Sequence, residues 1–501
     1  MLAFDNSYAR LPDRFYARVA PTKVGDPQVV RINRALAELL GASVEQLASP
    51  SGAAFLVGNE IPAGAEPLAL AYAGHQFGGF VPQLGDGRAI LLGEVVGKDG
   101  QRRDIQLKGS GPTPFSRGGD GRAALGPVLR EYLVSEAMAA LGIPTTRALA
   151  VAITGEAVVR EQVLPGAVLT RVAASHLRVG TFEFFAARGD REALVALTSH
   201  ALARHYPHAA GGGNDALALL EHVIEAHAQL VARWLGVGFV HGVMNTDNTA
   251  ISGETLDYGP CAFLDEYDPG KKFSSIDHRG RYAFSNQPRI ALWNMARLAD
   301  TLLGLIADDE ETAVQLATQR LARFPDLFQA AHLRVLRAKL GLAAQPAGET
   351  SETAEAADRA LADDLLRKLA ENRVDYTLFF RRLCDSAAAG DAATADGAVL
   401  SLFADPTAFA SWAETWRRRL ATQPLAPEER ASAMRRANPA FIPRNHRVEE
   451  AIAAAVHHRD FKPFELLAEV LVQPYDDHPE AAHLQDPPEP DQRVYQTFCG
   501  T

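Results

Sequence analysis

One polar loop, residues 241–248, constrains the fold of this chain more than any other feature. It reads His-Gly-Val-Met-Asn-Thr-Asp-Asn and follows Ala216 to Leu235, a stretch with apolar residues at helical spacing. A short apolar run, Thr249 to Ile251, is predicted to be a strand, and Asp257 follows it in Asp-Tyr-Gly. A loop rich in Asp and Asn is most often only a turn. Loop, hairpin and second acidic turn together predict a magnesium site with oxygen ligands from Asn248 and Asp257.

The loop also has the frame of the protein-kinase catalytic loop, His-Arg-Asp-x-x-x-x-Asn, with His241 and Asn248 at its two ends. Kinases have an aspartate in this frame that accepts the proton of the substrate hydroxyl. Here that position is Val243, which cannot accept a proton. The nearest carboxylate is Asp247. The chain is therefore either an inactive kinase-like protein or an enzyme whose chemistry depends on Asp247.

Two upstream features occur in the order that kinases use. Gly85 and Gly87 precede Arg88 and a predicted strand, Ala89 to Val96, and glycines there let backbone N–H groups approach a phosphate. Lys108 ends the next predicted strand, which begins at Asp104, after the hairpin turn Lys-Asp-Gly at 98–100. This is the position of the lysine that binds ATP phosphates in kinases. Taken singly, these features would be an ordinary hairpin and an edge lysine.

A helix is predicted from Val128 to Ala140, ending before Gly142. Glu131 on this helix is the candidate ion-pair partner of Lys108, and Glu136 is the alternative. Exposed helix carboxylates are usually only surface charge.

Arginines and glycines suited to a polyphosphate gather in the loop Ser116 to Arg122, which includes Asp120 and Gly121. Arg171 and Arg178 are seven residues apart, which would put them on one face of a helix if this segment is helical. The alternative for each arginine is an ion pair with one of the many carboxylates of the chain.

Long motifs identify the chain as similar to the selenoprotein O family nearly from end to end. They are Phe-Asp-Asn-Ser-Tyr at 4–8, Tyr-Ala-Gly-His-Gln-Phe-Gly at 72–78, Lys-Gly-Ser-Gly-Pro-Thr-Pro-Phe-Ser-Arg at 108–117, the loop at 241–248, and Asn-Pro-Ala-Phe-Ile-Pro-Arg-Asn at 438–445. The resemblance implies a pseudokinase-like enzyme that binds ATP in a flipped orientation. It further implies metal-dependent transfer of AMP to Ser, Thr or Tyr hydroxyls of protein substrates.

The resemblance also implies roles for particular residues. Asp247 would accept the proton, and Asn248 and Asp257 would hold Mg²⁺ or Mn²⁺, with Asp257 also near the phosphates. The residues that would bind the nucleotide are Gly85, Gly87, Arg88, Lys108, Asp120, Gly121, Arg171, Arg178 and Asp257.

Three other activities stay open on the sequence. They are transfer of another nucleotide, such as UMP with manganese, ordinary phosphoryl transfer, and a non-catalytic ATP-binding scaffold. The absence of an aspartate at Val243 favours the scaffold. The retained Lys108, Asn248, Asp257 and arginines favour an enzyme.

The predicted fold class is α+β, a protein-kinase-like bilobal fold with a β-rich N-lobe and a helical C-lobe. The boundaries divide the chain into an N-terminal extension (1–65), the N-lobe (66–165), the C-lobe (166–342) and a helical C-terminal region with a tail (343–501). The further predicted elements are strands Thr146–Thr154 and Glu156–Arg160, a helix Ile290–Ile306, a linker and solvated helix within Ala343–Asp364, and a proline-rich tail, Pro479–Pro490.

Charge and composition exclude some classes of binding partner and predict the cellular compartment. The net charge of −11 argues against bulk binding to nucleic acid or an anionic membrane. No apolar run approaches the roughly 20 residues of a spanning helix, and residues 1–18 are polar, so a cytoplasmic protein is expected. Cys261, Cys384 and Cys499 are too widely spaced for a zinc motif. Animal members of the family have selenocysteine near the C-terminus, where this chain has Cys499, and a regulatory Cys261–Cys499 disulfide is a hypothesis.

Overall fold

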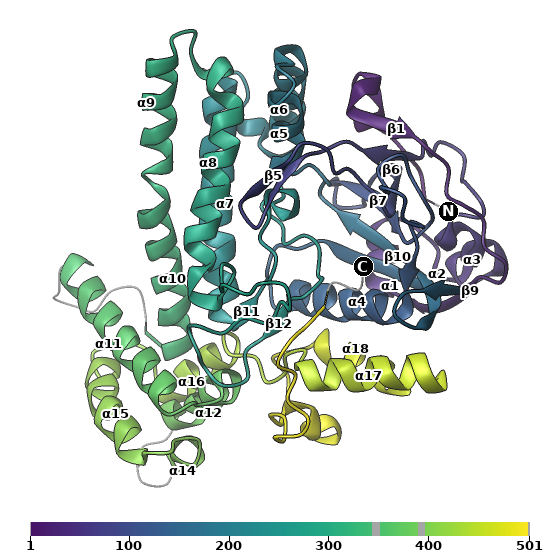
Figure 1. Ribbon diagram of the computed structural model, residues 1–501. Coiled ribbons are helices and arrows are strands. Elements are labelled where there is room, and N and C mark those ends of the chain that lie inside the picture. The colour runs from purple at the N-terminus through teal and green to yellow at the C-terminus, as the bar shows by residue number, and fades with distance from the viewer. Residues whose placement is uncertain (1, 343–350, 389–395, 499–501) are drawn as a thin grey trace.

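The computed structural model describes residues 2–342, 351–388 and 396–498, and an antiparallel sheet organises its N-terminal part (Figure 1). The strand order is β1-β3-β6-β7-β10-β9-β2, with β8 paired to β10. The strands are β1 Tyr16–Arg18, β2 Gln28–Ile32, β3 Leu68–Leu70, β6 Ala89–Val96, β7 Arg102–Lys108, β8 Ala123–Ala124, β9 Arg147–Val159 and β10 Val163–Ala173. The sheet thus includes two strands, β1 and β2, from the first 65 residues.

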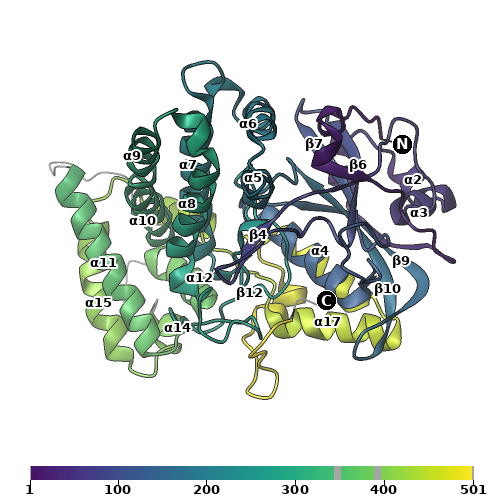
Figure 2. The ribbon, with the colours of Figure 1, turned by 45° about the horizontal axis from the view of Figure 1, so that its top comes forward.

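Helices cover both faces of this sheet. One face packs against the short helices α1 Arg34–Leu39, α2 Val44–Leu47 and α3 Pro50–Val57. The other packs against α4 Leu125–Ala140, which is covered in turn by α17 Asn445–His458 and α18 Lys462–Leu471 from the far end of the chain. Figures 1 and 2 show α17 beside α4 in both views.

The rest of the chain is mainly helical. One hydrophobic core joins α5 Val179–Ala186, α6 Arg191–His205, α7 Asp215–Gly236, α8 Gln287–Ile306, α9 Glu310–Leu321 and α10 Phe324–Leu340. A second core, with the buried Trp412 and Trp416, joins α10 to α11 Ser351–Glu371, α12 Tyr376–Ala388, α14 Gly397–Leu400, α15 Pro406–Leu420 and α16 Pro427–Arg435. Among the described helices, none is both long and apolar enough to cross a membrane.

Short elements lie between the sheet and the helices. They are the hairpin β4 Gly74–Gln76 and β5 Gly79–Val81, and the pair β11 Phe239–Val240 and β12 Ala262–Phe263. The 3₁₀ turns are η1 Tyr8–Arg10, η2 Asp13–Phe15, η3 Pro207–Ala209, η4 Thr246–Asn248, η5 Phe284–Asn286 and η6 Pro479–Gln485.

The elements with clear periodicity are confirmed. The strand Ala89–Val96 has the predicted bounds, and the strand ending at Lys108 begins two residues earlier than expected. The predicted helices Val128–Ala140, Ala216–Leu235 and Ile290–Ile306 are present, each beginning one to three residues earlier. A mixed architecture with an antiparallel sheet and separate helices follows, as expected for the α+β class.

Three local predictions are wrong. β9 is one strand and not two, because Gly155 at φ +74° bends it without ending its pairing with β10. The run Thr249–Ile251 makes isolated bridges to residues 178 and 255 but no strand, because its neighbouring residues pair with different segments and no ladder forms. The proline-rich tail contains the 3₁₀ helix η6.

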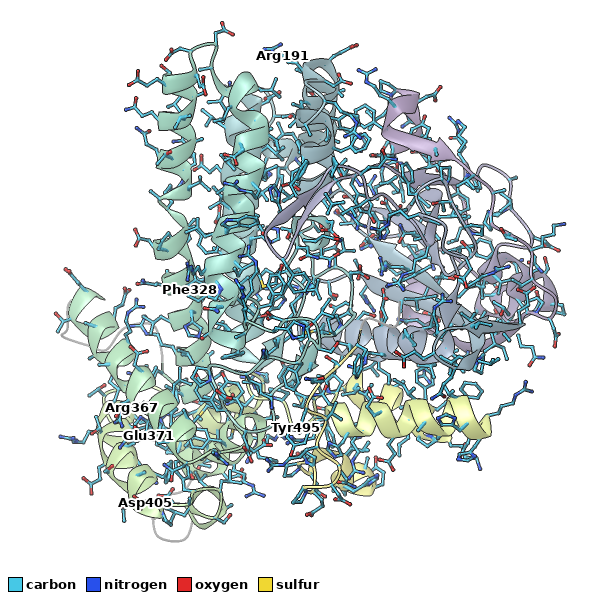
Figure 3. The ribbon with its side chains drawn as sticks, in the orientation of Figure 1. Arg191, Phe328, Arg367, Glu371, Asp405 and Tyr495 are labelled. Atoms are coloured by element: carbon cyan, nitrogen blue, oxygen red, sulfur yellow. The ribbon has the colours of Figure 1, made fainter. Side chains whose placement is uncertain are left out.

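The helix predicted as solvated, α11, is exposed on one face only. Arg367 and Glu371 pair at 2.9 Å on the exposed side (Figure 3), whereas Leu361, Leu365 and Leu369 are buried in the second core. The preceding linker, 343–350, lies outside the described residues.

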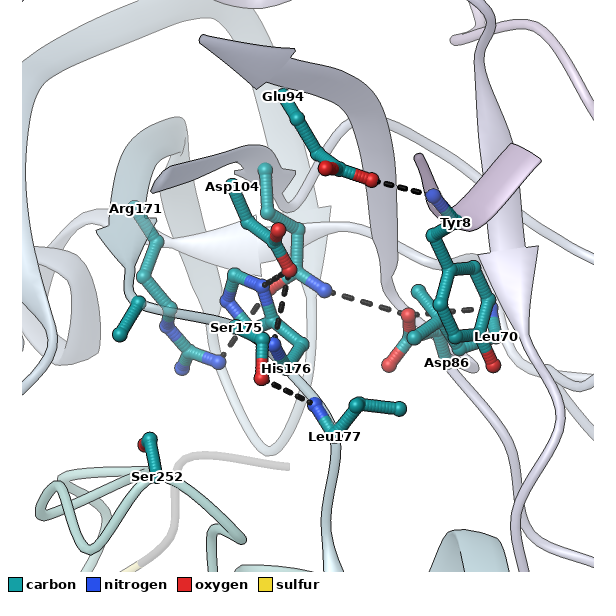
Figure 4. Close-up of polar contacts among 12 residues, drawn as sticks. Tyr8, Leu70, Asp86, Glu94, Asp104, Arg171, Ser175, His176, Leu177 and Ser252 are labelled. Atoms are coloured by element: carbon teal, nitrogen blue, oxygen red, sulfur yellow. Dashed lines mark hydrogen bonds and ion pairs between the residues drawn. The ribbon is translucent and has the colours of Figure 1, made fainter. Parts of the chain in front are cut away.

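A buried polar network ties the N-terminal segment to the sheet and to α6. Glu94 on β6 accepts the backbone N–H groups of Ser7 at 2.9 Å and Tyr8 at 2.5 Å (Figure 4). Arg204 on α6 pairs with Glu94 and with Asp104, at 2.8 Å from the latter. These contacts satisfy charges that would otherwise be costly to bury.

Lys339 near the end of α10 is buried without a compensating charge. It is 3% exposed, its Nζ lies 4.2 Å from the ring centre of Phe380, and no carboxylate of the described ranges pairs with it. Burial lowers its pKa to about 7. Between pH 7 and its ordinary value of 10.5 the unfolded state therefore binds more protons, so this residue makes the protein more stable as pH rises through that range.

The substitution Lys339→Met is expected to stabilise the protein by roughly 2–4 kcal/mol at pH 7, because it removes a desolvated ammonium and keeps the apolar volume. The gain should shrink towards pH 10, where the wild-type amine is largely neutral. Urea unfolding of both proteins at the two pH values measures this. A variant less stable than the wild type at pH 7, or a gain that does not depend on pH, would contradict the assignment.

Candidate active site

Lys108 lies between two carboxylates at the junction of the sheet and the helices. Its Nζ is 2.6 Å from Glu131 Oε2 and 2.8 Å from Asp257 Oδ1. The sequence left Glu131 and Glu136 as alternatives, and the contact decides for Glu131. Glu136 instead accepts hydrogen bonds from Arg147, at 2.6 Å, and from Asn33.

Arg171 completes the cluster from the neighbouring strand. Its Nε donates to Glu131 Oε1 at 2.7 Å and its Nη2 to Asp257 Oδ1 at 3.1 Å. Arg171 lies on β10 and Arg178 in the extended segment before α5. The segment between them is not helical, so the condition under which the two arginines would share a helix face is not met. In a strand, seven residues span a far longer distance than two helical turns.

The cations dominate the electrostatics of the cluster. Burial raises the pKa of Asp257, but the charges of Lys108, Arg171 and Arg88 outweigh this effect and hold the pKa well below its usual range. The pKa of Glu131 is lowered in the same way, against burial, by Arg171 and Lys108. Both carboxylates are ionised at neutral pH. Asp257 is the open member of the cluster, with 31% of its side chain exposed, whereas Glu131 and Arg171 are almost fully buried.

The backbone presents Asp257 in an unusual conformation. Its φ is +71°, the left-handed region that non-glycine residues rarely adopt. The preceding residue is held in place because the Leu256 carbonyl oxygen lies 3.0 Å from His241 Nε2. Strain of this kind persists where the surrounding structure fixes it and is common at functional sites.

Asp247 is buried, with 7% of its surface exposed. Its Oδ2 accepts from Gln76 Nε2 at 3.2 Å, whereas its buried Oδ1 has no partner among the described residues. Burial raises the pKa of Asp247 to about 6, against the effect of the Gln76 hydrogen bond. At neutral pH it is mostly ionised and has an oxygen available for a proton.

Arg178 holds the backbone beside Asp247. Its Nη1 donates to the Asp247 carbonyl oxygen at 2.9 Å, its Nη2 lies 3.9 Å from Asp86 Oδ1, and its guanidinium carbon lies 4.3 Å from the ring centre of Tyr72. Asp86 is buried, and burial raises its pKa despite the charge of Arg178. Figure 4 shows Asp86 on the side of the polar network opposite Arg171.

The hairpin β4–β5 is fixed onto the loop that carries Asp247. The backbone N–H of His75 donates to Thr246 Oγ1 at 2.6 Å, and Phe77 N–H donates to Asn245 Oδ1 at 3.1 Å. Below them, Glu183 on α5 lies 2.5 Å from both His75 Nδ1 and Thr246 Oγ1. None of His75, Gln76 and Glu183 was predicted to have a role, although the first two lie in the motif at 72–78.

The segment from Gly109 to Ser116, which leads into the glycine- and arginine-rich loop, contacts the glycine turn at Gly85 and Gly87. Thr113 Oγ1 donates to the Asp86 carbonyl oxygen at 2.7 Å, and Gly109 N–H donates to that of Arg88 at 2.7 Å. A Cβ on Gly85, whose φ is +82°, would lie 2.3 Å from the ring of Phe115. Only glycine fits this close approach.

The two remaining predicted nucleotide residues lie in the outer part of that loop. Asp120 is exposed and pairs with Arg160 at 2.8 Å, and its pKa is lowered chiefly by this hydrogen bond. At Gly121, a Cβ would lie 2.0 Å from the Gly111 carbonyl oxygen. Contacts of either residue with the Lys108 cluster are absent from the described structure.

Asn248 and Asp257 offer oxygen atoms suited to a hard divalent cation. Asn248 Nδ2 donates to the Val243 carbonyl oxygen at 3.1 Å, which turns the amide oxygen away from this contact, and no described residue donates to that oxygen. Asp257 Oδ2 likewise has no hydrogen bond within the described ranges, since both contacts use Oδ1. An amide and a carboxylate oxygen beside phosphate oxygens fit Mg²⁺ or Mn²⁺. The described residues contain no cluster of three or more His, Cys, Asp or Glu that could hold a metal.

Substituting alanine for Gly74 is expected to reduce turnover about 10- to 100-fold, because small displacements of a reacting group are costly. The new Cβ would lie 2.5 Å from Asp247 Oδ1 and 2.9 Å from Asp247 Cβ, so the carboxylate must move. Gly79→Ala in the same hairpin is the control, because its nearest contact would be an ordinary 3.5 Å. Steady-state rates of the two variants test this, and their melting temperatures should be equal if both fold normally. Equal rates for the two variants would contradict the prediction.

Known proteins with similar sequences identify the family of this chain. The family model described as protein adenylyltransferase SelO matches residues 1–472. The chain belongs to the SelO family. Relatives named protein nucleotidyltransferase YdiU include one from Methylorubrum populi, 63% identical with 100% of this chain and 99% of the relative covered. Another, from Bradyrhizobium sp. strain ORS 278, is 59% identical with 99% of each chain covered. SelO membership confirms the predicted resemblance and the prediction of a nucleotidyltransferase enzyme.

The C-terminal segment around Thr497 lies against the chain that follows Asp257. Thr497 Oγ1 donates to the Pro260 carbonyl oxygen at 2.6 Å, and Thr497 N–H donates to that of Phe273 at 2.8 Å. Cys261 is a buried thiol, 1% exposed. Cys499, the partner of Cys261 in the hypothesised disulfide, lies outside the described residues.

Proposed function

We propose that this protein transfers AMP from ATP to hydroxyl groups of Ser, Thr or Tyr in protein substrates, on a kinase-like bilobal fold. The observation that carries the proposal is the contact of Asp257 with both Lys108 and Arg171, which gathers cations at an open carboxylate. Such a site suits a polyphosphate and its metal ion. The names of the SelO family model and of the YdiU relatives support nucleotide transfer to protein.

Asp247 takes the role of proton acceptor in this proposal. The acceptor hydroxyl oxygen attacks the α-phosphorus of ATP, its proton passes to Asp247, and the bond from the α-phosphorus to the β-bridging oxygen breaks, releasing pyrophosphate. Val243, in the frame position of the kinase base, is buried, and its polar contacts are made by its backbone, which accepts from Asn248 Nδ2 and donates to His241 Nδ1. The unpartnered Oδ1 of Asp247 supports this role.

The cations of the cluster stabilise the charge that develops on the leaving pyrophosphate. Arg88 adds a cation beside Asp257, and none of the carboxylates in the described ranges pairs with it. Arg171 and Arg178 are each about 3% exposed, and cations this deeply buried support a nucleotide bound with its phosphates innermost, which is the flipped orientation. Asn248 and Asp257 would hold Mg²⁺ or Mn²⁺, which supplies further charge stabilisation to the phosphates.

A scaffold function receives less support. An ATP-binding scaffold has no need for an unpartnered buried carboxylate oxygen beside its metal site, and burying one is costly. We further propose that the protein works in the cytoplasm, where buried thiols such as Cys261 and Cys384 stay reduced.

The identity of the transferred group is tested by intact mass spectrometry. The protein is incubated with unrelated acceptor proteins, Mg²⁺ or Mn²⁺, and either ATP or UTP. A mass gain of one AMP group on an acceptor or on the protein itself, larger with ATP than with UTP, is the expected result. A gain of UMP only would favour the uridylyl alternative. A gain of one phosphate group would overturn the proposal in favour of kinase activity.

A further inference from the structure

A partly exposed surface of aromatic rings and arginines lies beside the hairpin that contacts Asp247 and has no role in the chemistry described above. It consists of Phe80, Arg281, Arg289, Trp293 and Arg297, here called the aromatic–arginine surface. Phe80 belongs to the hairpin β4–β5 and is 42% exposed. The hairpin lies at the junction of the sheet and the helices, with β5 labelled in Figure 1 and β4 in Figure 2.

The surface is continuous with the loop that carries Asp247. The ring of His75 lies 5.0 Å from that of Phe80 and 5.3 Å from that of Trp293. The same His75 donates its backbone N–H to Thr246, and Gln76 beside it donates to Asp247. A segment lying across Phe80 and Trp293 is therefore within a few residues of the proton acceptor.

Arginines surround the indole ring of Trp293. The guanidinium carbons of Arg281 and Arg297 lie 4.7 Å and 5.0 Å from its ring centres. Arg289 and Arg297 are four residues before and after Trp293 on α8, so all three lie along one face of the helix. Arginines stacked on an indole keep their N–H groups available for carboxylates at the ring edge.

Most of this positive charge is not neutralised. Arg297 pairs with Asp300 at 3.0 Å, but no carboxylate of the described residues pairs with the side chain of Arg281 or Arg289. Asp277 beneath them accepts the backbone N–H groups of Arg281 and Tyr282. The Nε atoms of Arg281 and Arg297 are buried without an acceptor in the described structure. On a chain of net charge −11, this surface carries a local excess of positive charge.

We propose that the aromatic–arginine surface binds an acidic segment of the protein acceptor and so presents a nearby hydroxyl to Asp247. This inference rests on the proposed AMP transfer and adds the substrate class: hydroxyls flanked by Asp or Glu. Charge complementarity selects the partner, since guanidinium groups bind carboxylates with two parallel hydrogen bonds. The apolar faces of Phe80 and Trp293 provide desolvated contact area for the same segment.

Two acceptor peptides of equal length test the specificity with the wild-type protein. Both carry one serine and one tyrosine, flanked by Asp and Glu in one peptide and by Lys and Arg in the other. The acidic peptide should be modified with a kcat/KM about 10-fold higher or more. Added salt should reduce this preference, because it screens exposed charges. Equal rates, or a preference for the basic peptide, would overturn the inference.

Reversing the charge of one arginine tests whether the preference for the acidic peptide arises at the aromatic–arginine surface. Arg281→Glu should raise KM for the acidic peptide about 10-fold with a smaller change in kcat, and should remove the preference over the basic peptide. Arg334→Glu is the matched control, because Arg334 is exposed on α10, away from the hairpin. A preference that survives Arg281→Glu would place acidic recognition elsewhere and overturn the inference.

Self-modification separates this inference from the proposed function. AMP transfer to the protein itself, measured in the same reactions, reports the chemistry independently of the peptides. Self-modification with no preference between the peptides would refute only the aromatic–arginine surface as a docking site. Absence of AMP transfer to every acceptor, including the protein itself, would refute the proposed function and with it this inference.

Discussion

Substituting asparagine for Asp257 is expected to reduce AMP transfer by about 10³-fold or more, since electrostatic stabilisation of the transition state usually contributes more to such catalysis than any other effect. The change removes a charge that Lys108 contacts at 2.8 Å and Arg171 at 3.1 Å, together with a proposed metal ligand. Asparagine tolerates the left-handed backbone of this residue, at φ +71°, better than alanine. Asparagine is therefore the substitution that disturbs the backbone of this loop least.

Measuring ATP binding shows whether the loss of activity comes with a loss of metal-dependent nucleotide binding. With Asp257→Asn, metal-dependent binding of ATP should weaken, as measured by calorimetry with and without Mg²⁺. Asp326→Asn serves as a control, because Asp326 is an exposed aspartate on α10. Wild-type rates in Asp257→Asn would contradict the assignment of the metal and phosphate site.

The second large effect is expected for Asp247→Asn, with a loss of about 10²- to 10⁴-fold in kcat, the usual contribution of a general base. The amide keeps the shape of the side chain and its contact with Gln76 but cannot accept a proton. ATP affinity should stay near that of the wild type, because Asp247 contacts none of Lys108, Glu131 and Arg171 among the described interactions. Single-turnover rates and ATP titration together measure this. Full activity of the variant would show that Asp247 is not the proton acceptor and that another group accepts the proton.

The difference between the two variants is itself informative. Asp257→Asn should lose both binding and chemistry, whereas Asp247→Asn should lose chemistry alone. Identical losses of ATP affinity in both would show that Asp247 belongs to the nucleotide site and not to the acceptor side.

Parts of the site were predictable because they are carried by short, ordered motifs. Several features occur along the sequence in the order that kinases use: the glycine turn, Lys108 at the end of a strand, Glu131 on a helix, the polar loop and Asp257. The structure brings Lys108, Glu131 and Asp257 together. The choice between Glu131 and Glu136 was not predictable. It depends on which side of α4 faces β7, and Glu136 instead meets Arg147 at the start of β9.

Other parts depend on contacts that no local pattern encodes. His75 and Thr246 are 171 residues apart in sequence, yet share a 2.6 Å hydrogen bond that fixes the hairpin on the loop. The spacing of Arg171 and Arg178 left open whether their segment is helical, because spacing alone does not distinguish strand from helix. The pairing of β10 with β7 shows that Arg171 lies on a strand. The covering of α4 by α17 and α18 likewise joins segments over 300 residues apart.

The central claim, transfer of AMP, is tested most directly with ATP labelled at either the α- or the γ-phosphate. Each is incubated with the protein, Mg²⁺ and a mixture of acceptor proteins, beside Asp257→Asn as the inactive control. The account predicts that label enters protein only from α-labelled ATP and that this signal is lost in the control. Label entering protein only from γ-labelled ATP would contradict the account and make this enzyme a kinase.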